Sequence, residues 1–386
     1  MTHARRATTS IDMNPLVGPD QSWQPVNVLQ GITERREHGV VILAPDTGKM
    51  IRRLVYVNSY GGAGILEQIK AGLLPSHHLW GCFDLVRKGY EVALAEPLQD
   101  FYLYRNPLPH DLRLLRLVRS WLGRDGIVYC AHNVLHWLPL LRAIGGIRCH
   151  IVSLLFAREP LDFSRAHSGI IALNRAAEEQ ARRLAPKAKV ARLAWGTDLR
   201  VFPRLPYRPD WFLSCGITHR DHRTLSEAAH LVRSRVRVIS PRLPAQLSWP
   251  DSVTLVTNAD GLHPMKYGDL LLDQYSQCAA SLIILDDDPA QYTGVGFTNL
   301  LEAMAMARPV IVTRTGGLPT EIDVEQEGCG LFVPPGAPRA LADAINQLAT
   351  DPERARQMGE RGRSLCESHY NIDRYADQLH EFFGSL

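Results

Sequence analysis

The sequence lacks the features that mark membrane, secreted and nucleic-acid-binding proteins. No apolar run approaches the ~18 residues of a transmembrane helix, and the N-terminus has no apolar core for a signal peptide. The net charge of +3 is too small to indicate nucleic acid as a partner. The seven cysteines are odd in number and form no close pairs, so we expect buried thiols rather than disulfides or a zinc framework. The cytoplasm is therefore the expected compartment.

What is present describes a globular α/β protein of two domains. The chain has 386 residues, which is more than a single hydrophobic core usually accommodates. Of these residues 45% are hydrophobic and 22% charged, as is typical of a globular protein. Short apolar strand patterns alternate with helical patterns from residue 53 onward. One strand is expected earlier, at residues 40–43. The later expected strands cover residues 53–57, 91–95, 126–130, 150–154, 168–173, 211–216, 235–239, 253–257, 281–285, 309–313 and 330–334. This alternation predicts open parallel sheets, whose ligands bind beyond the carboxyl ends of the strands.

Residues 292–319 are the most informative segment, because they predict a loop, a helix and a strand in that order. Gly294 and Gly296 permit a tight turn, 300–306 are strong helix formers, and 309–313 form a β-branched run. A helix start leaves N–H groups unpaired and carries a partial positive charge, and glycine lets an anion approach them. The segment therefore suits a phosphate. The plain alternative is a glycine-rich turn before an ordinary amphipathic helix.

Glu302 is expected about one turn into this helix, with its carboxylate directed along the same face as the bound group. Carboxylates accept hydrogen bonds from paired sugar hydroxyls, so a ribose or hexose diol is the expected partner. A solvated or capping side chain is the alternative role.

The same segment resembles the donor-site motif of retaining GT-B glycosyltransferases, in particular glycosyltransferase family 4. The matching stretches are Glu302-Ala303-Met304, Pro309-Val310-Ile311 and Gly316-Gly317. One departure is clear: Gly294 stands where the family has its first Glu, a residue thought to touch the donor sugar. The cluster at 286–288 is either a substitute carboxylate or solvated loop charge.

The resemblance implies a GT-B architecture, with two Rossmann-like domains facing a central cleft. We expect an N-terminal extension over residues 1–50 that packs on the first domain, and an acceptor-binding domain over 51–205. A donor-binding domain over 206–370 and a helix over 371–386 that crosses back to the first domain complete the chain. The domain crossing at 194–203 resembles the family's interdomain segment, with Gly196, Asp198, Phe202 and Pro203 matching it.

The resemblance also assigns candidate site residues. The candidate catalytic residues are His132, which follows the strand ending at Cys130, together with Arg220 and Glu302. The candidate donor-binding residues are Gly61, Gly62, Gly216, Arg220, His222, Arg223, Gly294, Val295, Gly296, Phe297, Thr298, Asn299 and Glu302. A guanidinium suits a diphosphate because it can donate to two oxygens at once. A structural histidine, a solvated basic turn and ordinary glycine turns are the competing interpretations.

The expected function is sugar transfer from a UDP- or GDP-linked donor to an acceptor hydroxyl, with retention and without a cofactor or metal. His132 and His136 lack a carboxylate or cysteine at metal spacing. The acceptor, whether a glycan, a lipid-linked group or a small molecule, stays open, as does the oligomeric state. The basic helix at 113–119 is a covering helix or a weak membrane contact.

Three other functions stay open. A nucleotide-sugar epimerase has the same fold, and a catalytically inactive nucleotide-sugar-binding protein would explain Gly294. A dehydrogenase fits poorly because the glycines at 61–64 lack the dinucleotide-binding spacing.

Overall fold

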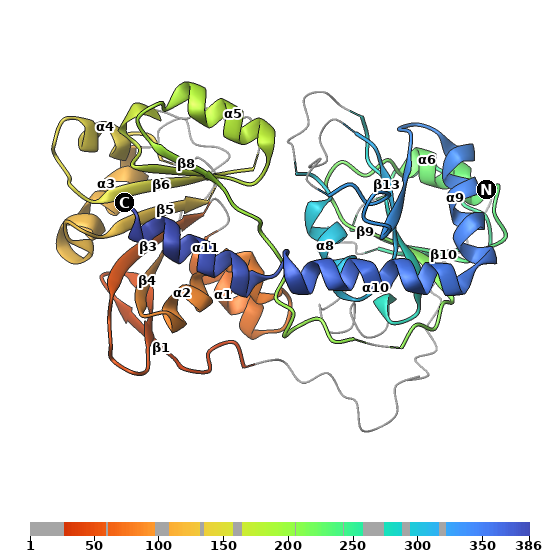
Figure 1. Cartoon of the computed structure of the whole chain (residues 1–386), viewed down its shortest axis with the longest axis horizontal. Helices are drawn as coiled ribbons and strands as arrows, with labels where there is room; N and C mark the ends of the chain where they lie inside the picture. The colour runs from red at the N-terminus through yellow and green to blue at the C-terminus, as the bar shows by residue number, and fades with distance from the viewer. Residues whose placement is uncertain are drawn as a thin grey trace, which may run out of the picture.

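The structure is a computed structural model that describes residues 27–58, 61–96, 108–131, 135–156, 164–204, 206–241, 243–257, 274–287, 294–315 and 322–386. These residues form two lobes that lie side by side, each built on one β-sheet (Figure 1).

The sheet of the N-terminal lobe has the strand order β1-β2-β4-β3-β5-β6-β7-β8. Its strands are β1 (Ile32–Glu37), β2 (Val40–Pro45), β3 (Arg52–Asn58), β4 (Tyr90–Ala95), β5 (Ile127–Ala131), β6 (His150–Leu155), β7 (Gly169–Ala172) and β8 (Lys189–Arg192). The strands from β3 to β8 pair in parallel, whereas β2 is antiparallel to both β1 and β4. The carboxyl ends of the parallel strands therefore meet at one edge, which is where this kind of sheet binds ligands.

Helices cover both faces of this sheet. They are α1 (Gly62–Lys70), α2 (Cys82–Arg87), α3 (Leu108–Leu117), α4 (Leu138–Ala143) and α5 (Arg175–Leu184), with the short segments η1 (Ser76–Leu79), η3 (Val118–Leu122) and η4 (Ser164–Ala166). Side chains alternate across a strand. Leu54 and Tyr56 of β3 accordingly belong to the core cluster that contains α1 and α2, and Val55 and Val57 to the one that contains α3.

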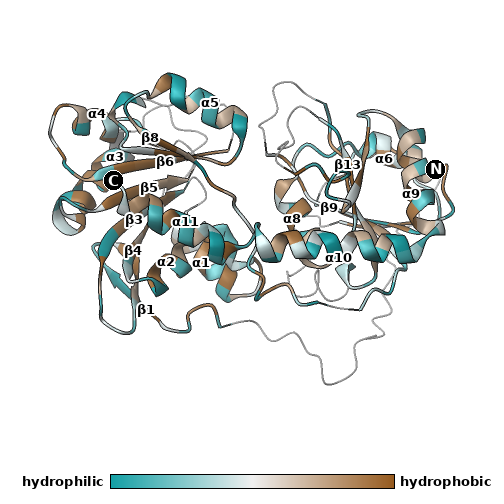
Figure 2. Ribbon diagram, viewed as in Figure 1, coloured by the Kyte–Doolittle hydropathy of each residue, from teal (hydrophilic) through white to brown (hydrophobic). Residues whose placement is uncertain are grey.

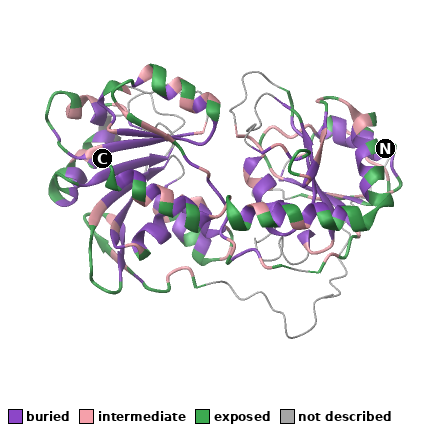
Figure 3. Cartoon of the chain, viewed as in Figure 1, coloured by how far each residue is buried: buried purple, intermediate pink, exposed green. Residues whose placement is uncertain are grey.

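The C-terminal lobe holds a fully parallel sheet of order β11-β10-β9-β12-β13-β14. The strands are β9 (Trp211–Cys215), β10 (Val236–Ile239), β11 (Val253–Val256), β12 (Cys278–Ile283), β13 (Val310–Thr313) and β14 (Gly330–Val333). Its helices are α6 (His222–Ala229), α8 (Phe297–Ala305), α9 (Pro338–Thr350) and α10 (Pro352–Ser368), and the chain continues into α11 (Ile372–Gly384). The strands are mostly apolar and buried, while the outer helix faces are polar (Figures 2 and 3).

The last helix, α11, packs on the N-terminal lobe after α10 has followed the C-terminal one (Figure 1). The Tyr375 hydroxyl lies 2.9 Å from the Tyr129 hydroxyl, and Arg52 Nη1 donates to the carbonyl of Phe383 at 2.6 Å. One apolar cluster also runs through both lobes and includes Trp195 of the domain crossing and Phe297 of α8. The two lobes therefore share a core as well as the chain connection.

The strands that the sequence did not predict lie at the sheet edges. β1 carries the polar sequence ITERRE, and β8, with the sequence KVAR, has exposed residues at both ends. An edge strand needs fewer apolar residues than a central one, so neither gives a strong apolar pattern. Residues 32–45 are thus part of the first sheet, where we had expected an extension packed on the domain. The domain boundaries themselves stay predictions. None of the described helices combines the length and the apolar sequence of a membrane span.

Candidate functional site

The start of α8 lies at the contact between the two lobes. Gly296 is its N-cap residue, with φ 82°, and Gly294 just before it has φ 119°. A Cβ at Gly294 would lie 3.7 Å from the carbonyl oxygen of Phe156, which belongs to the N-terminal lobe. Within the described part of the chain, no side chain accepts from the N–H groups that open α8, and the first turn carries no acidic residue. The Phe297 N–H donates to the carbonyl of Gly294 at 3.1 Å. The N–H groups of Thr298 and Asn299 are therefore the ones that remain for an anion.

Arg220 lies beside the first turn of α8. Its Nη2 donates to Asn299 Oδ1, and its Nη1 donates to the carbonyl of Thr218 at 3.0 Å. Burial lowers the pKa of the guanidinium, while Cys215, Tyr275 and Glu302 raise it. Among the described residues no carboxylate forms an ion pair with Arg220. A half-buried cation without a direct counter-ion is suited to binding an anionic ligand.

Because Gly216 has no side chain, the Arg220 guanidinium can pack against its backbone. It follows β9 with φ 131°, and a Cβ on it would lie 2.2 Å from Arg220 Nη2. The loop is fixed further because the Asp221 N–H donates to the carbonyl of Ile284 at 3.0 Å. The backbone angle therefore favours glycine here, and a side chain at this position would displace the guanidinium.

A groove of about 500 Å³ opens next to Arg220. It is lined by Ile217, His219, Arg220, His222, Leu243, Pro244 and Asp286. The Nδ1 atom of His222 is buried and has no hydrogen-bond partner among the described residues. Burial, and then the charge of Arg220, lowers the pKa of His222, so this imidazole is neutral at pH 7. The groove thus offers a cation and an unpaired imidazole atom to a polar ligand.

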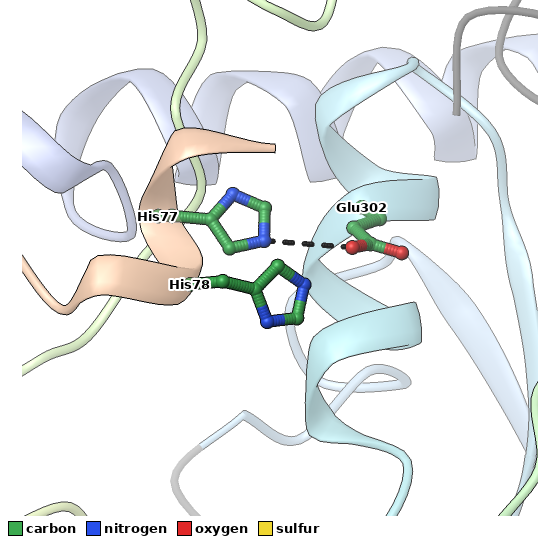
Figure 4. Close-up of side chains that lie close together, drawn as sticks. All are labelled: His77, His78 and Glu302. Carbon is green, nitrogen blue, oxygen red and sulfur yellow. Dashed lines mark ion pairs between the residues drawn. The ribbon is translucent and has the colours of Figure 1, made fainter. Parts of the chain in front are cut away.

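Glu302 lies in the second turn of α8 and points at the N-terminal lobe (Figure 4). Its side chain is 4% exposed, and its Oε1 lies 3.5 Å from Nε2 of His77, which is on η1 and fully buried. His78 lies beside this pair (Figure 4). The carboxylate thus reaches across the lobe contact, which was not foreseen from its position in the helix.

The surroundings of His77 determine which ring nitrogen carries the proton. The backbone N–H of Asp198 donates to Nδ1 at 3.3 Å. Burial lowers the pKa of His77 to about 3, although Asp198 raises it, so the ring is neutral at pH 7. A neutral ring with an accepting Nδ1 carries its proton on Nε2. The Nε2–H group therefore faces the Glu302 carboxylate.

His77, His78 and Glu302 also offer three ligand atoms within 4.8 Å of one another. A histidine that binds a metal through Nε2 normally donates its Nδ1–H to an acceptor. In His77 the Nδ1 atom accepts instead. The trio therefore fits a hydrogen-bond arrangement better than a metal site.

The glycine loop at Gly61 and Gly62, which precedes α1, differs in its surroundings from the loop before α8. Gly61 caps α1 with φ 79°, and a Cβ on Gly62 would lie 2.9 Å from Cβ of Leu94. The carboxylate of Glu96 accepts from the N–H of Ala63 in the first turn of α1. A protein carboxylate thus already binds at this helix start.

Comparison with known proteins connects the C-terminal lobe to a family. Residues 289–365 match the family model described as Glycosyl transferases group 1. The chain is 33% identical over 102 residues to alpha-maltose-1-phosphate synthase from Mycolicibacterium smegmatis, covering 25% of this chain and 26% of that protein. It is 33% identical over 91 residues to alpha-D-kanosaminyltransferase from Streptomyces kanamyceticus, covering 24% and 23%. The match therefore spans about a quarter of the length of these curated relatives.

The similarity to solved structures extends over most of both lobes. Sucrose-phosphate synthase from Thermosynechococcus elongatus has a TM-score of 0.61 at 16% identity, covering 87% of this chain and 99% of that one. HepE from Anabaena, solved in complex with UDP, has a TM-score of 0.60 at 14% identity, covering 87% and 100%. The chain has the GT-B fold. The predicted GT-B architecture is thereby confirmed, and so is the resemblance to glycosyltransferases over residues 289–365.

Within this GT-B fold, the candidate residues of the C-terminal lobe come together around the start of α8. The group consists of Gly216, Arg220, His222, Gly294, Val295, Gly296, Phe297, Thr298, Asn299 and Glu302. Arg223 is exposed on α6. His132 and the pair at 316–317 lie outside the described residues. The donor-binding and catalytic roles of all of these stay predictions.

Sequence reasoning missed His77, His78 and Glu96. The adjacent histidines at 77 and 78 are a visible signal, but nothing near them in the sequence indicates that they face α8. Asp198 was recognised as part of the domain crossing, without its hydrogen bond to His77.

Proposed function

We propose that this protein transfers a sugar from a nucleotide-diphosphate sugar to an acceptor hydroxyl, with retention of the anomeric configuration. The observation that carries the proposal is the uncapped start of α8 beside Arg220, inside the segment that matches Glycosyl transferases group 1. As the anomeric bond breaks, negative charge grows on the leaving diphosphate. Fixed N–H groups and a half-buried guanidinium stabilise such charge without reorganising.

The other residues take roles that follow from their chemistry. Glu302 accepts hydrogen bonds from the paired hydroxyls of the donor's ribose. His132, beyond the described residues, would hold the acceptor hydroxyl. Arg220 and the N–H groups neutralise the diphosphate, so the reaction needs no metal ion. We propose that it needs no cofactor either. The seven cysteines are buried and none of them forms a disulfide, which supports a reducing, cytoplasmic location.

The first experiment measures ligand binding and turnover in the full chain. Calorimetry with UDP and GDP tests the donor site, and UDP is the first probe because HepE was solved with it. Mass spectrometry of the protein with a panel of nucleotide sugars then detects slow hydrolysis. We expect one diphosphate to bind and one nucleotide sugar to be hydrolysed, with equal rates in the presence and absence of EDTA. NMR of the released sugar identifies the anomer first formed.

A charge-removing variant links this activity to the site. Glu302→Gln keeps the shape of the side chain but weakens its acceptor, so we expect hydrolysis to fall about tenfold or more. Glu327→Gln, on an exposed residue of the same lobe, is the matched control and should match the wild type. If neither UDP nor GDP binds the wild type, the proposal is wrong.

A specific observation also favours a second function, nucleotide-sugar binding without catalysis. Gly294 has φ 119°, a conformation that L side chains rarely adopt, so the loop is built for glycine rather than for the family's Glu. A protein that binds UDP but hydrolyses no member of the panel would support this function over transfer.

A further inference from the structure

We infer that His77 is a positioning residue, whose Nε2–H group holds the Glu302 carboxylate from across the lobe contact in the orientation that binds a donor diol. The inference rests on the proposed function, because it concerns how the donor-binding carboxylate is held. It adds an element of the N-terminal lobe to a donor site that the sequence assigned mainly to the C-terminal lobe.

The first support is the geometry at Glu302. Nε2 of His77 lies 3.5 Å from Oε1, and the two side chains point toward each other (Figure 4). This distance is too long for a full hydrogen bond. Accordingly, Nε2 is a buried polar atom without a hydrogen-bond partner among the described residues. A small approach of the lobes would complete the bond, so the donor group is poised for a closed, ligand-bound state.

The second support is that the protein fixes the His77 ring in position and in tautomer. The ring lies between Phe202, with centroids 5.9 Å apart, and the edge of Trp195 at 5.3 Å. Asp198 sets the tautomer through its backbone N–H. The Asp198 carboxylate is itself held by Ser76 and by Arg200 Nε at 2.7 Å.

These contacts connect the domain crossing to the candidate donor site. The residues that hold the His77 ring and the Asp198 carboxylate, apart from Ser76, belong to the crossing: Trp195, Asp198, Arg200 and Phe202. A change in the angle between the lobes therefore changes the contacts that position His77. Glu302 is therefore oriented only when the lobes are correctly arranged.

The test compares two probes that differ only in the diol. UDP carries both ribose hydroxyls, and 2′,3′-dideoxyuridine diphosphate carries neither. We expect His77→Phe, which keeps a ring but removes the N–H group, to weaken UDP binding about tenfold. It should change binding of the dideoxy probe less than about twofold, because that probe never engages Glu302. His230→Phe, on an exposed histidine, is the matched control. If GDP is the diphosphate that binds, the guanosine pair replaces the uridine pair.

Two further variants keep the test decisive if His77→Phe does not fold. The Gln amide of His77→Gln places an N–H group near the Nε2 position, whereas the shorter Asn of His77→Asn does not reach it. Gln should preserve the preference for UDP over the dideoxy probe, and Asn should lose it.

The outcomes separate this inference from the proposed function. If the wild type binds neither diphosphate, the proposed function has failed. If the wild type binds UDP but His77→Phe weakens both probes equally, or weakens neither, His77 is only a packing residue and the inference is overturned. Equal preferences in folded His77→Gln and His77→Asn would overturn it as well.

Discussion

Among the helices that begin after a glycine with positive φ, α1 and α8 have opposite electrostatic surroundings at their starts. α1 begins after Gly61 with φ 79°, and α8 begins after Gly296 with φ 82°. At α1, the Glu96 carboxylate accepts from the N–H of Ala63. At α8, no side chain of the described residues takes that role, and Arg220 is bound to Asn299 in the first turn.

The difference shows how one backbone feature serves two purposes. A helix start attracts negative charge wherever it occurs. Where the protein supplies its own carboxylate, that attraction stabilises the fold and leaves little for a ligand. Where it supplies a cation instead, as at α8, positive charge accumulates, and we predict that an external anion binds there. We therefore expect the charge beside a helix start to distinguish a structural glycine loop from one that binds an anionic ligand.

The largest expected effect comes from removing the cation at α8. Arg220→Ala should lower turnover by about 10² to 10³, because a preorganised donor to the leaving group is lost. Single-turnover kinetics with the nucleotide sugar that the panel identifies would measure it. Arg233→Ala removes an exposed arginine of the same lobe and should leave the rate unchanged. If Arg223→Ala shows the large loss instead, the exposed arginine of α6 binds the diphosphate.

The next test gives α8 the carboxylate that α1 already has. Thr298→Asp places a negative charge in the first turn, where it should favour the helix but repel a diphosphate. We expect UDP affinity to fall about 10- to 100-fold by calorimetry while the melting temperature holds or rises. Thr298→Asn, similar in shape but neutral, is the control. Equal affinities in the two variants would show that no anion binds at α8.

Much of the fold was predictable because its signals are local. Central strands such as β5 and β13 are short apolar runs between turn residues, and the glycines at 294 and 296 mark the loop before α8. The edge strands β1 and β8 gave no such signal, since a polar edge strand looks like a loop.

The sequence predicted several residues of the candidate site but not which residues contact one another. The motif around Glu302 placed the carboxylate in α8, whereas its contact with His77 joins residues far apart in the sequence. In the same way, Gly61 could be recognised as a loop residue, but the presence of Glu96 at that helix start depends on how α1 packs against β4. Long-range contacts of this kind follow from the packing of the lobes, which one sequence does not specify.

Acid should destabilise the lobe contact at α8. Burial lowers the pKa of His77 to about 3 and that of His78 to about 3, while Asp198 and Glu302, respectively, raise them. The unfolded chain, with histidine pKa near 6.5, then binds more protons below that pH. The contribution of these two imidazoles to the free energy of unfolding is therefore fully present above about pH 6.5. It decreases as the pH falls toward 3, by about 1.4 kcal/mol per pH unit for each imidazole. Urea unfolding of wild type and His77→Gln between pH 6.5 and 5 should show a shallower slope in the variant. Identical slopes would contradict the assignment of His77 as a buried, neutral ring.

The smallest effect is expected at α1, and it decides whether the comparison between the two helix starts is correct. Glu96→Ala removes the carboxylate that binds Ala63 N–H, and losing such a contact costs about 1 kcal/mol of stability. UDP affinity should stay within about twofold, because the diphosphate is expected at α8. Glu67→Ala, on an exposed glutamate of α1, controls for the loss of one charge from the lobe. If Glu96→Ala instead binds UDP at least tenfold more tightly, the carboxylate has been competing with the diphosphate. The glycine loop of α1 would then be the anion site, and the contrast between the two helices would be reversed.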